Sequence, residues 1–131
     1  MTIQVLLVDD EKTVRTTMAA HLEDEGFHVL QAGSAEAAVA MVGEGCLPDV
    51  CAMDMRLPGM DRHDAILALY ERLPGVQFLI HTGSLSYVLT DDLRDIGIGD
   101  ETVFRKPLQD MRVLAEAVRT LATDKTPHRG K

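Results

Sequence analysis

The chain alternates between short, nearly continuous apolar runs and longer segments whose apolar residues recur at helical spacing. The apolar runs lie at residues 3–8, 27–32, 49–54, 76–82 and 102–106. Helical spacing occurs at residues 11–26, 34–45, 61–73, about 85–96 and 108–122. Strands that are apolar on both faces are typical of a parallel sheet covered by helices on both sides. The pattern therefore predicts an α/β fold in which five strands alternate with five helices.

Signals at the ends of the helical segments agree with this pattern. Gly26 follows the first segment as a stop signal, Ser34 is suited to cap the second, and Pro107 precedes the last. After the last segment the periodicity is lost. We therefore expect one domain over residues 1–123 and a disordered tail over 124–131.

Composition excludes several classes of protein. The chain has 13 Lys and Arg against 21 Asp and Glu, a net charge of −8, which disfavours direct nucleic-acid binding. No apolar stretch is long enough for a membrane helix and no signal peptide is recognised, so we expect a cytoplasmic protein. The two cysteines do not predict a disulfide framework, and the five histidines show no paired spacing typical of a metal site.

Polar residues with complementary chemistry follow four of the predicted strands. Asp9 and Asp10 follow the first strand, Asp54 ends the third, Thr82 ends the fourth and Lys106 ends the fifth. In an open α/β sheet, ligands bind outside the carboxyl ends of the strands, near the point where strand order reverses. With the strand order 2-1-3-4-5, these four strand ends converge on one edge.

The chemistry of this edge favours metal and phosphoryl binding. Clustered carboxylates repel one another, and Mg²⁺, which prefers oxygen ligands, relieves that repulsion. Asp54 can then act as a nucleophile that forms an aspartyl phosphate, while Lys106 and the Thr82 hydroxyl neutralise or donate to the phosphoryl oxygens. Taken singly, each residue has a plainer interpretation as a helix start, a turn residue or a surface lysine. Their coincidence at one edge favours the functional interpretation.

The motifs "VLLVDDE", "PDVCAMDMRLPGMD", "FLIHTG" and "FRKPL" occur in an order and spacing that resemble the receiver domains of two-component response regulators. The resemblance covers about residues 3–122. It implies a flavodoxin-like, doubly wound five-stranded parallel sheet of order 2-1-3-4-5. It also implies that Asp54 is the phosphoacceptor, Thr82 the switch hydroxyl and Lys106 the lysine that bonds the phosphoryl group.

The resemblance further implies a Mg²⁺ site and a set of partners. Asp10 resembles a direct Mg²⁺ ligand, Asp9 one that acts mainly through water, and the backbone carbonyl of Arg56 a further ligand beside Asp54. The donor would be a histidine kinase or phosphotransfer protein. A face made by helix four, strand five and helix five would respond to phosphorylation and contact an effector, or pair in a homodimer. The implied activity is limited to self-catalysed phosphotransfer and autodephosphorylation, so the chain is not expected to be an enzyme in the usual sense.

Three positions depart from the family pattern. Val103 occupies the usual position of the switch aromatic residue, and Phe104 follows one step later, where a strand would turn it to the other face. Arg62 stands where a glycine is common in the family. Arg56 lies two residues after the acceptor, and we expect it to affect how fast the phosphoryl group is lost.

Three other functions share parts of this pattern. A flavin-binding protein of the same fold would need a phosphate loop after strand one, where this chain carries acidic residues. A haloacid-dehalogenase-type phosphatase would need a second acid two residues after Asp54, where Arg56 stands. The alternative that stays open is a pseudo-receiver that binds partners independently of phosphorylation. The chain ends about eight residues after the last helix, so it is expected to be a stand-alone receiver or one domain of a longer protein whose output domain is missing here.

Overall fold

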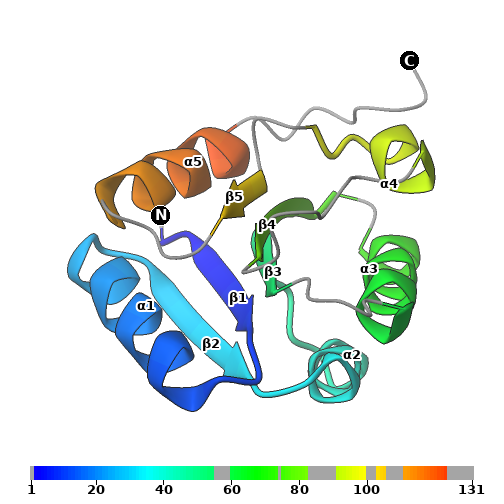
Figure 1. Ribbon diagram of the computed structural model, residues 1–131, viewed down its shortest axis with the longest axis horizontal. Helices are drawn as coiled ribbons and strands as arrows, with labels where there is room; N and C mark the ends of the chain where they lie inside the picture. Colours follow the sequence, from blue (N-terminus) through cyan, green and yellow to red (C-terminus); the bar gives the residue numbers. More distant parts are fainter. Residues whose placement is uncertain are drawn as a thin grey trace.

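The computed structural model describes residues 2–54, 60–73, 75–82, 91–99, 103–105 and 111–123. Within these residues five strands alternate with five helices, as predicted (Figure 1). The strands are β1 (Gln4–Val8), β2 (His28–Ala32), β3 (Val50–Asp54), β4 (Gln77–Thr82) and β5 (Val103–Arg105). The helices are α1 (Lys12–Asp24), α2 (Ala35–Gly43), α3 (Met60–Arg72), α4 (Asp91–Asp95) and α5 (Met111–Thr123).

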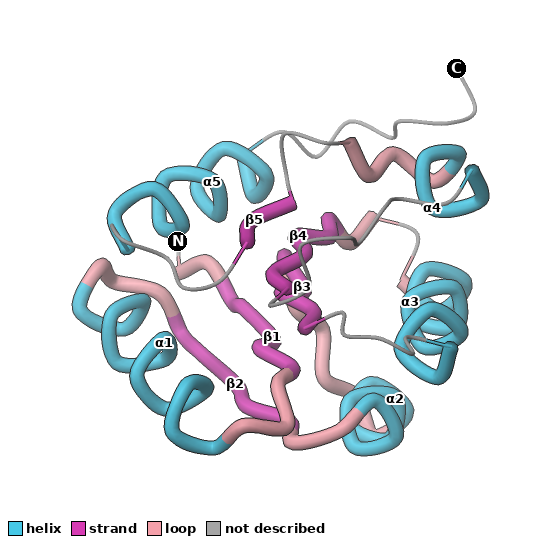
Figure 2. The backbone as a smooth tube through the Cα atoms, in the orientation of Figure 1, coloured by secondary structure: helices cyan, strands magenta, loops and turns pink. Residues whose placement is uncertain are grey.

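The strands form one parallel sheet in the order β2-β1-β3-β4-β5 (Figure 2). This confirms the predicted doubly wound topology, in which the order reverses between β1 and β3. The central strands β3 and β4 are buried throughout, which explains why they are apolar on both faces. Strand β2 lies at an edge, and its His28 and Gln31 are exposed.

Helices cover both faces of the sheet, α1 and α5 on one side and α2, α3 and α4 on the other (Figure 1). Each face has its own apolar cluster. The first cluster joins β-strand side chains to Met18, Ala19, Leu22, Leu114, Ala115 and Val118. The second joins them to Ala35, Ala38, Val42, Ile66, Leu69 and Leu93. The sheet thus packs against an apolar cluster on each face, and these clusters hold the carboxyl ends of its strands in place.

The predicted helix boundaries have identifiable causes. Gly26 adopts a φ of 97°, a left-handed conformation that glycine tolerates, directly after α1. The Ser34 hydroxyl accepts a hydrogen bond of 3.0 Å from the Ala37 N–H and caps α2. Both signals are confirmed.

Some predictions fall partly or wholly outside the described residues. The helix expected at about 85–96 is described only as α4, and residues 83–90 are not among the described ones. The tail predicted over 124–131 lies outside them as well. Among the helices that the structure describes, none combines the length and apolarity needed to cross a membrane.

Candidate functional site

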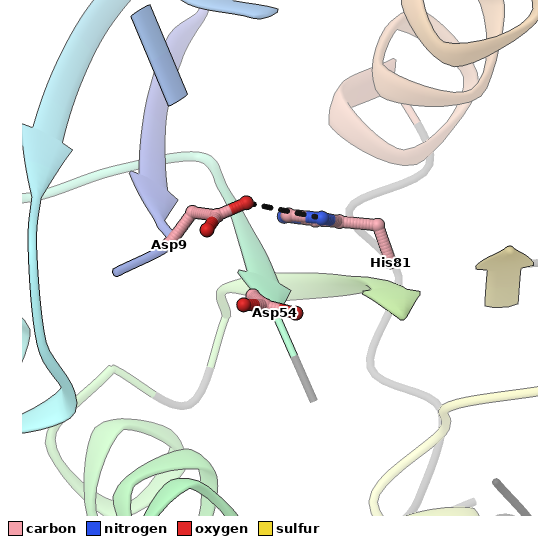
Figure 3. Close-up of side chains that lie close together, drawn as sticks. All are labelled: Asp9, Asp54 and His81. Carbon is pink, nitrogen blue, oxygen red and sulfur yellow. Dashed lines mark ion pairs between the residues drawn. The ribbon is translucent and has the colours of Figure 1, made fainter. Parts of the chain in front are cut away.

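Three polar side chains gather, fully buried, at the carboxyl edge of the sheet (Figure 3). Asp9 directly follows β1, Asp54 is the last residue of β3, and His81 is the next-to-last residue of β4. One potential ligand atom from each lies within 4.8 Å of the others. Three strands far apart in sequence therefore deliver two carboxylates and an imidazole to one point.

Strand register explains why these side chains share a face. Asp54 and His81 are paired residues of the β3–β4 ladder. Two positions earlier, Ala52 and Leu79 pack in the cluster beneath α1 and α5. Because side chains alternate along a strand, Asp54 and His81 turn toward that same face.

Asp9 is held in place by several contacts. Its N–H donates to the Ala32 carbonyl at 3.2 Å, which continues the pairing of β1 with β2 beyond Val8. Its Oδ1 accepts from the Glu11 N–H at 2.8 Å, and its backbone carbonyl accepts from Arg15 Nη1 at 2.8 Å. Its Oδ2 then lies 3.8 Å from His81 Nδ1. The carboxylate is thereby fixed with one oxygen on the backbone and the other directed at the cluster.

The electrostatics of the cluster favour a cation. Two carboxylates that are fully buried stand close together, and taking them out of water raises the cost of their mutual repulsion. Carboxylate oxygens are ligands that Mg²⁺ accepts. The donor set in this part of the chain therefore fits a divalent ion.

The structure places the other predicted site residues as follows. Asp10 is exposed, and which of the two adjacent acids ligates Mg²⁺ directly stays a prediction. Thr82 is fully buried as the last residue of β4, directly after His81. Arg56 and Lys106 lie outside the described residues.

Two of the departures from the family pattern have a structural setting. Val103 packs against the cluster beneath α2, α3 and α4, whereas Phe104 packs against the opposite cluster. The expectation that Phe104 turns to the other face is confirmed, and its partner in the β4–β5 ladder is His81. Arg62 lies within α3, and residues other than glycine adopt the helical backbone conformation readily.

His81 is the site residue that sequence reasoning missed. Histidine spacing along the chain predicted no metal site, but the relevant partners are brought together by the sheet and not by local spacing. The signal was present in the predicted runs: when the runs 49–54 and 76–82 are aligned by their first residues, Asp54 falls opposite His81, which is the pairing observed.

Both cysteines are free thiols, as the sequence indicated. Cys51 lies buried within β3, and burial, reinforced by the nearby Cys46, raises the pKa of its thiol. Burial also raises the pKa of Cys46, although a hydrogen bond from Gln4 opposes this. Cys51 is therefore a core residue that stays protonated in the folded chain.

Comparison with known proteins agrees with this geometry. A receiver domain protein from Methanospirillum hungatei superposes with a TM-score of 0.80 at 22% identity, over 95% of this chain and 97% of that one, and so shares the fold. The N-terminal domain of a response regulator protein from Carboxydothermus hydrogenoformans has a TM-score of 0.78 at 26% identity, over 92% of this chain and 94% of that one.

Curated relatives point the same way. The probable transcriptional regulatory protein TcrX of Mycobacterium tuberculosis is 29% identical over 80% of this chain and 44% of its own length. The transcriptional regulatory protein AruR of Pseudomonas aeruginosa is 42% identical over 47% of this chain and 27% of its own length. The chain thus spans less than half the length of either relative. Residues 5–119 match the profile of the response regulator receiver domain, and the chain belongs to that family.

Proposed function

We propose that the chain accepts a phosphoryl group on Asp54 from a histidine kinase or phosphotransfer protein, with Mg²⁺ bound at the same edge of the sheet. The observation that carries the proposal is the burial of Asp54 beside Asp9 at the topological switch point of a receiver domain. A carboxylate without a role there would face repulsion from Asp9 with no benefit to folding. The proposal also places the protein in the cytoplasm.

The transfer would proceed by direct attack. An oxygen of Asp54 forms the new P–O bond while the P–N bond of a phosphohistidine donor breaks. The departing imidazole nitrogen keeps the electron pair and takes up a proton. Mg²⁺, when bound, offsets the negative charge that the carboxylates and the phosphoryl oxygens share.

The chain's own residues then have distinct tasks. Asp9, fixed by the Glu11 N–H, keeps a carboxylate oxygen directed at the site. In this proposal the positive charge of Lys106 neutralises the phosphoryl oxygens, and the Thr82 hydroxyl donates a hydrogen bond to one of them. The face around α4, β5 and α5 is assigned the change in partner binding, toward an effector protein or an output domain. Because Val103 stands in place of an aromatic residue, we expect the change in partner binding to occur without a rotamer change of an aromatic side chain at this position.

The experiment is intact-mass spectrometry after incubation with acetyl phosphate, in Mg²⁺ or in EDTA. A phosphoryl adduct is expected on the wild-type chain when Mg²⁺ is present and not when EDTA is present. Asp54→Asn should carry none, and Asp95→Asn, which removes an exposed carboxylate on α4, should behave as wild type. A folded wild-type chain that gains no adduct would contradict the proposal and favour the pseudo-receiver.

A further inference from the structure

The imidazole of His81 adds a nitrogen donor to a site whose other donors are oxygens. His81 is fully buried, and its ring lies beside Asp9 and Asp54 in the close-up of the site (Figure 3). Mg²⁺ in proteins binds oxygen almost exclusively, whereas imidazole suits first-row transition ions such as Zn²⁺, Ni²⁺ and Fe²⁺. Asp9, Asp54 and His81 together thus offer both oxygen and nitrogen ligands, and this mixture bears on which ion binds.

We propose that His81 is a metal ligand, so that this receiver site binds a divalent first-row transition ion in preference to Mg²⁺. The proposal deepens the phosphoacceptor function above and rests on it for the site's use, but metal ligation by His81 stands on its own geometry. Asp9 and Asp54 supply the oxygen ligands and His81 supplies the nitrogen.

The distances fit a shared ion. Two atoms that are each about 2.1 Å from one ion lie roughly 3 to 4.2 Å apart, depending on the angle between the bonds. The separation of 3.8 Å between His81 Nδ1 and Asp9 Oδ2 lies within that range. All three ligand atoms lie within 4.8 Å of one another, which is close to the span of ligand atoms around a single ion.

The position of His81 in the sheet favours a fixed ligand over a mobile one. In the ladders it stands between Asp54 on β3 and Phe104 on β5, and Leu79 precedes it on the same face. Its ring therefore lies next to the apolar cluster on that face and beside the Asp9 carboxylate. A ligand held in this way loses little conformational freedom when the ion binds.

The competing role for His81 is a structural one, in which the ring only makes a polar contact with the Asp9 carboxylate at 3.8 Å. That role predicts no direct contact with the ion. It also predicts that removal of the ring changes the affinity for Mg²⁺ and for transition ions by the same factor. The two roles therefore separate on metal selectivity.

The test compares the affinity for Co²⁺ and for Mg²⁺ by calorimetry on the full chain. In the wild type we expect Co²⁺ to bind at least about tenfold tighter than Mg²⁺, and His81→Leu to remove about a tenfold or larger factor from Co²⁺ binding while Mg²⁺ binding changes little. His28→Gln removes an exposed histidine on β2 and should leave both affinities unchanged. Equal factors for the two ions in His81→Leu would overturn the proposal.

A measurement on the wild type covers the case in which His81→Leu does not fold. In ¹⁵N-histidine-labelled protein, NMR should show a ligation shift of one His81 ring nitrogen on titration with Zn²⁺, with Asp54→Asn as the control that weakens the site. An unchanged His81 resonance at saturation would overturn the proposal. Intact-mass assay of the phosphoryl adduct in Mg²⁺ keeps the two claims apart: an adduct without nitrogen ligation refutes the His81 role alone, and nitrogen ligation without an adduct refutes only the phosphoacceptor function.

Discussion

Asp54 and His81 are paired across the β3–β4 ladder, both fully buried and both on the α1–α5 face of the sheet. The two residues are far apart in sequence, because helix α3 connects β3 to β4. Local sequence patterns therefore do not reveal that Asp54 and His81 are paired. Asp9 completes the group from the neighbouring strand. Two carboxylates are thereby held near one imidazole in a region without solvent, an arrangement that binding of a cation stabilises.

The first prediction concerns the cost of this arrangement in metal-free conditions. Asp54→Asn should raise the free energy of unfolding by about 1–2 kcal/mol in EDTA at neutral pH, because it removes one of two buried, mutually repelling carboxylates. Urea unfolding measures the difference. Asp95→Asn is the matched control, since it removes the same charge from an exposed position and should change stability by less than about 0.5 kcal/mol. A loss of stability in Asp54→Asn would contradict the electrostatic account.

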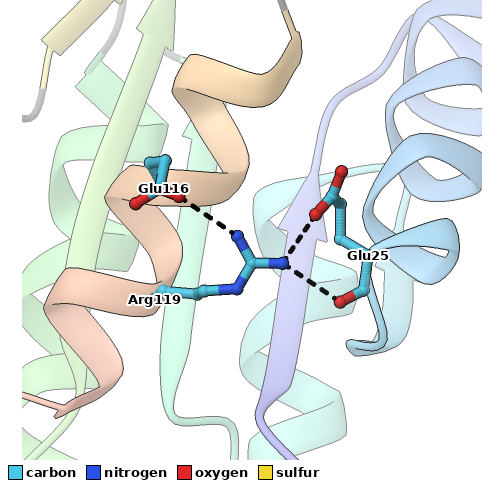
Figure 4. A network of polar contacts seen from close by, with 3 residues as sticks. All are labelled: Glu25, Glu116 and Arg119. Atoms are coloured by element: carbon cyan, nitrogen blue, oxygen red, sulfur yellow. Dashed lines mark hydrogen bonds and ion pairs between the residues drawn. The ribbon is translucent and has the colours of Figure 1, made fainter.

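The second prediction concerns the contact that ties α5 to the end of α1 (Figure 4). Arg119 donates to Glu25 Oε1 at 2.6 Å and to the Glu25 carbonyl at 3.3 Å, and its guanidinium lies 5.2 Å from the centre of the Phe27 ring. Arg119→Ala should lower the free energy of unfolding by about 1 kcal/mol, a modest value because the pair is partly exposed.

Two variants serve as references for that effect. Arg119→Lys should recover less than half of the loss, because an ammonium group lacks the planar fork and stacks less well on Phe27. Glu116→Gln should have almost no effect, since Glu116 is 73% exposed and lies 3.6 Å from Arg119. If Glu116→Gln destabilised the protein as much as Arg119→Ala, the contact with Glu25 would not be the stabilising one.

The third prediction concerns stability at alkaline pH. Burial raises the pKa of Cys51 in the folded chain, while in the unfolded chain the thiol ionises at about pH 8.5. Above that pH the unfolded state holds fewer protons, so stability falls as pH rises, by up to about 1.4 kcal/mol per pH unit from this group. Below it the thiol contributes no pH dependence.

Chemical unfolding at a series of alkaline pH values measures this slope. Cys51→Ala should show a shallower decline than the wild type, and comparison of slopes cancels the constant cost of the smaller side chain. Cys46→Ser should keep most of the wild-type slope, since Cys46 is only partly buried. Identical slopes in the wild type and Cys51→Ala would refute the assignment.

Most of the fold could be predicted from the sequence because the central strands are buried on both faces. Strand β3 and the centre of β4 are apolar for that reason, and the alternation of strands with helical segments leaves few topologies. Strand β5 is described over Val103–Arg105, within the run predicted at residues 102–106.

The site could be predicted only in part. The sequence singles out Asp54 as a candidate because a carboxylate is conspicuous at the end of an apolar strand. The sequence does not determine which of Asp9 and Asp10 turns inward, because that depends on the hydrogen bond from the Asp9 N–H to the Ala32 carbonyl on β2. His81 was missed because its partners come from other strands and an isolated histidine in an apolar run resembles a core residue.

The central claim is that Asp54 carries the phosphoryl group. The most direct measurement treats the phosphorylated chain with borohydride, which reduces an acyl phosphate to an alcohol, and then maps the peptides by mass spectrometry. The account predicts homoserine at position 54 in Mg²⁺-treated protein, and unmodified Asp54 in EDTA. Reduction at Asp9 or Asp10, or a phosphoryl group that remains on His81 after borohydride, would contradict it.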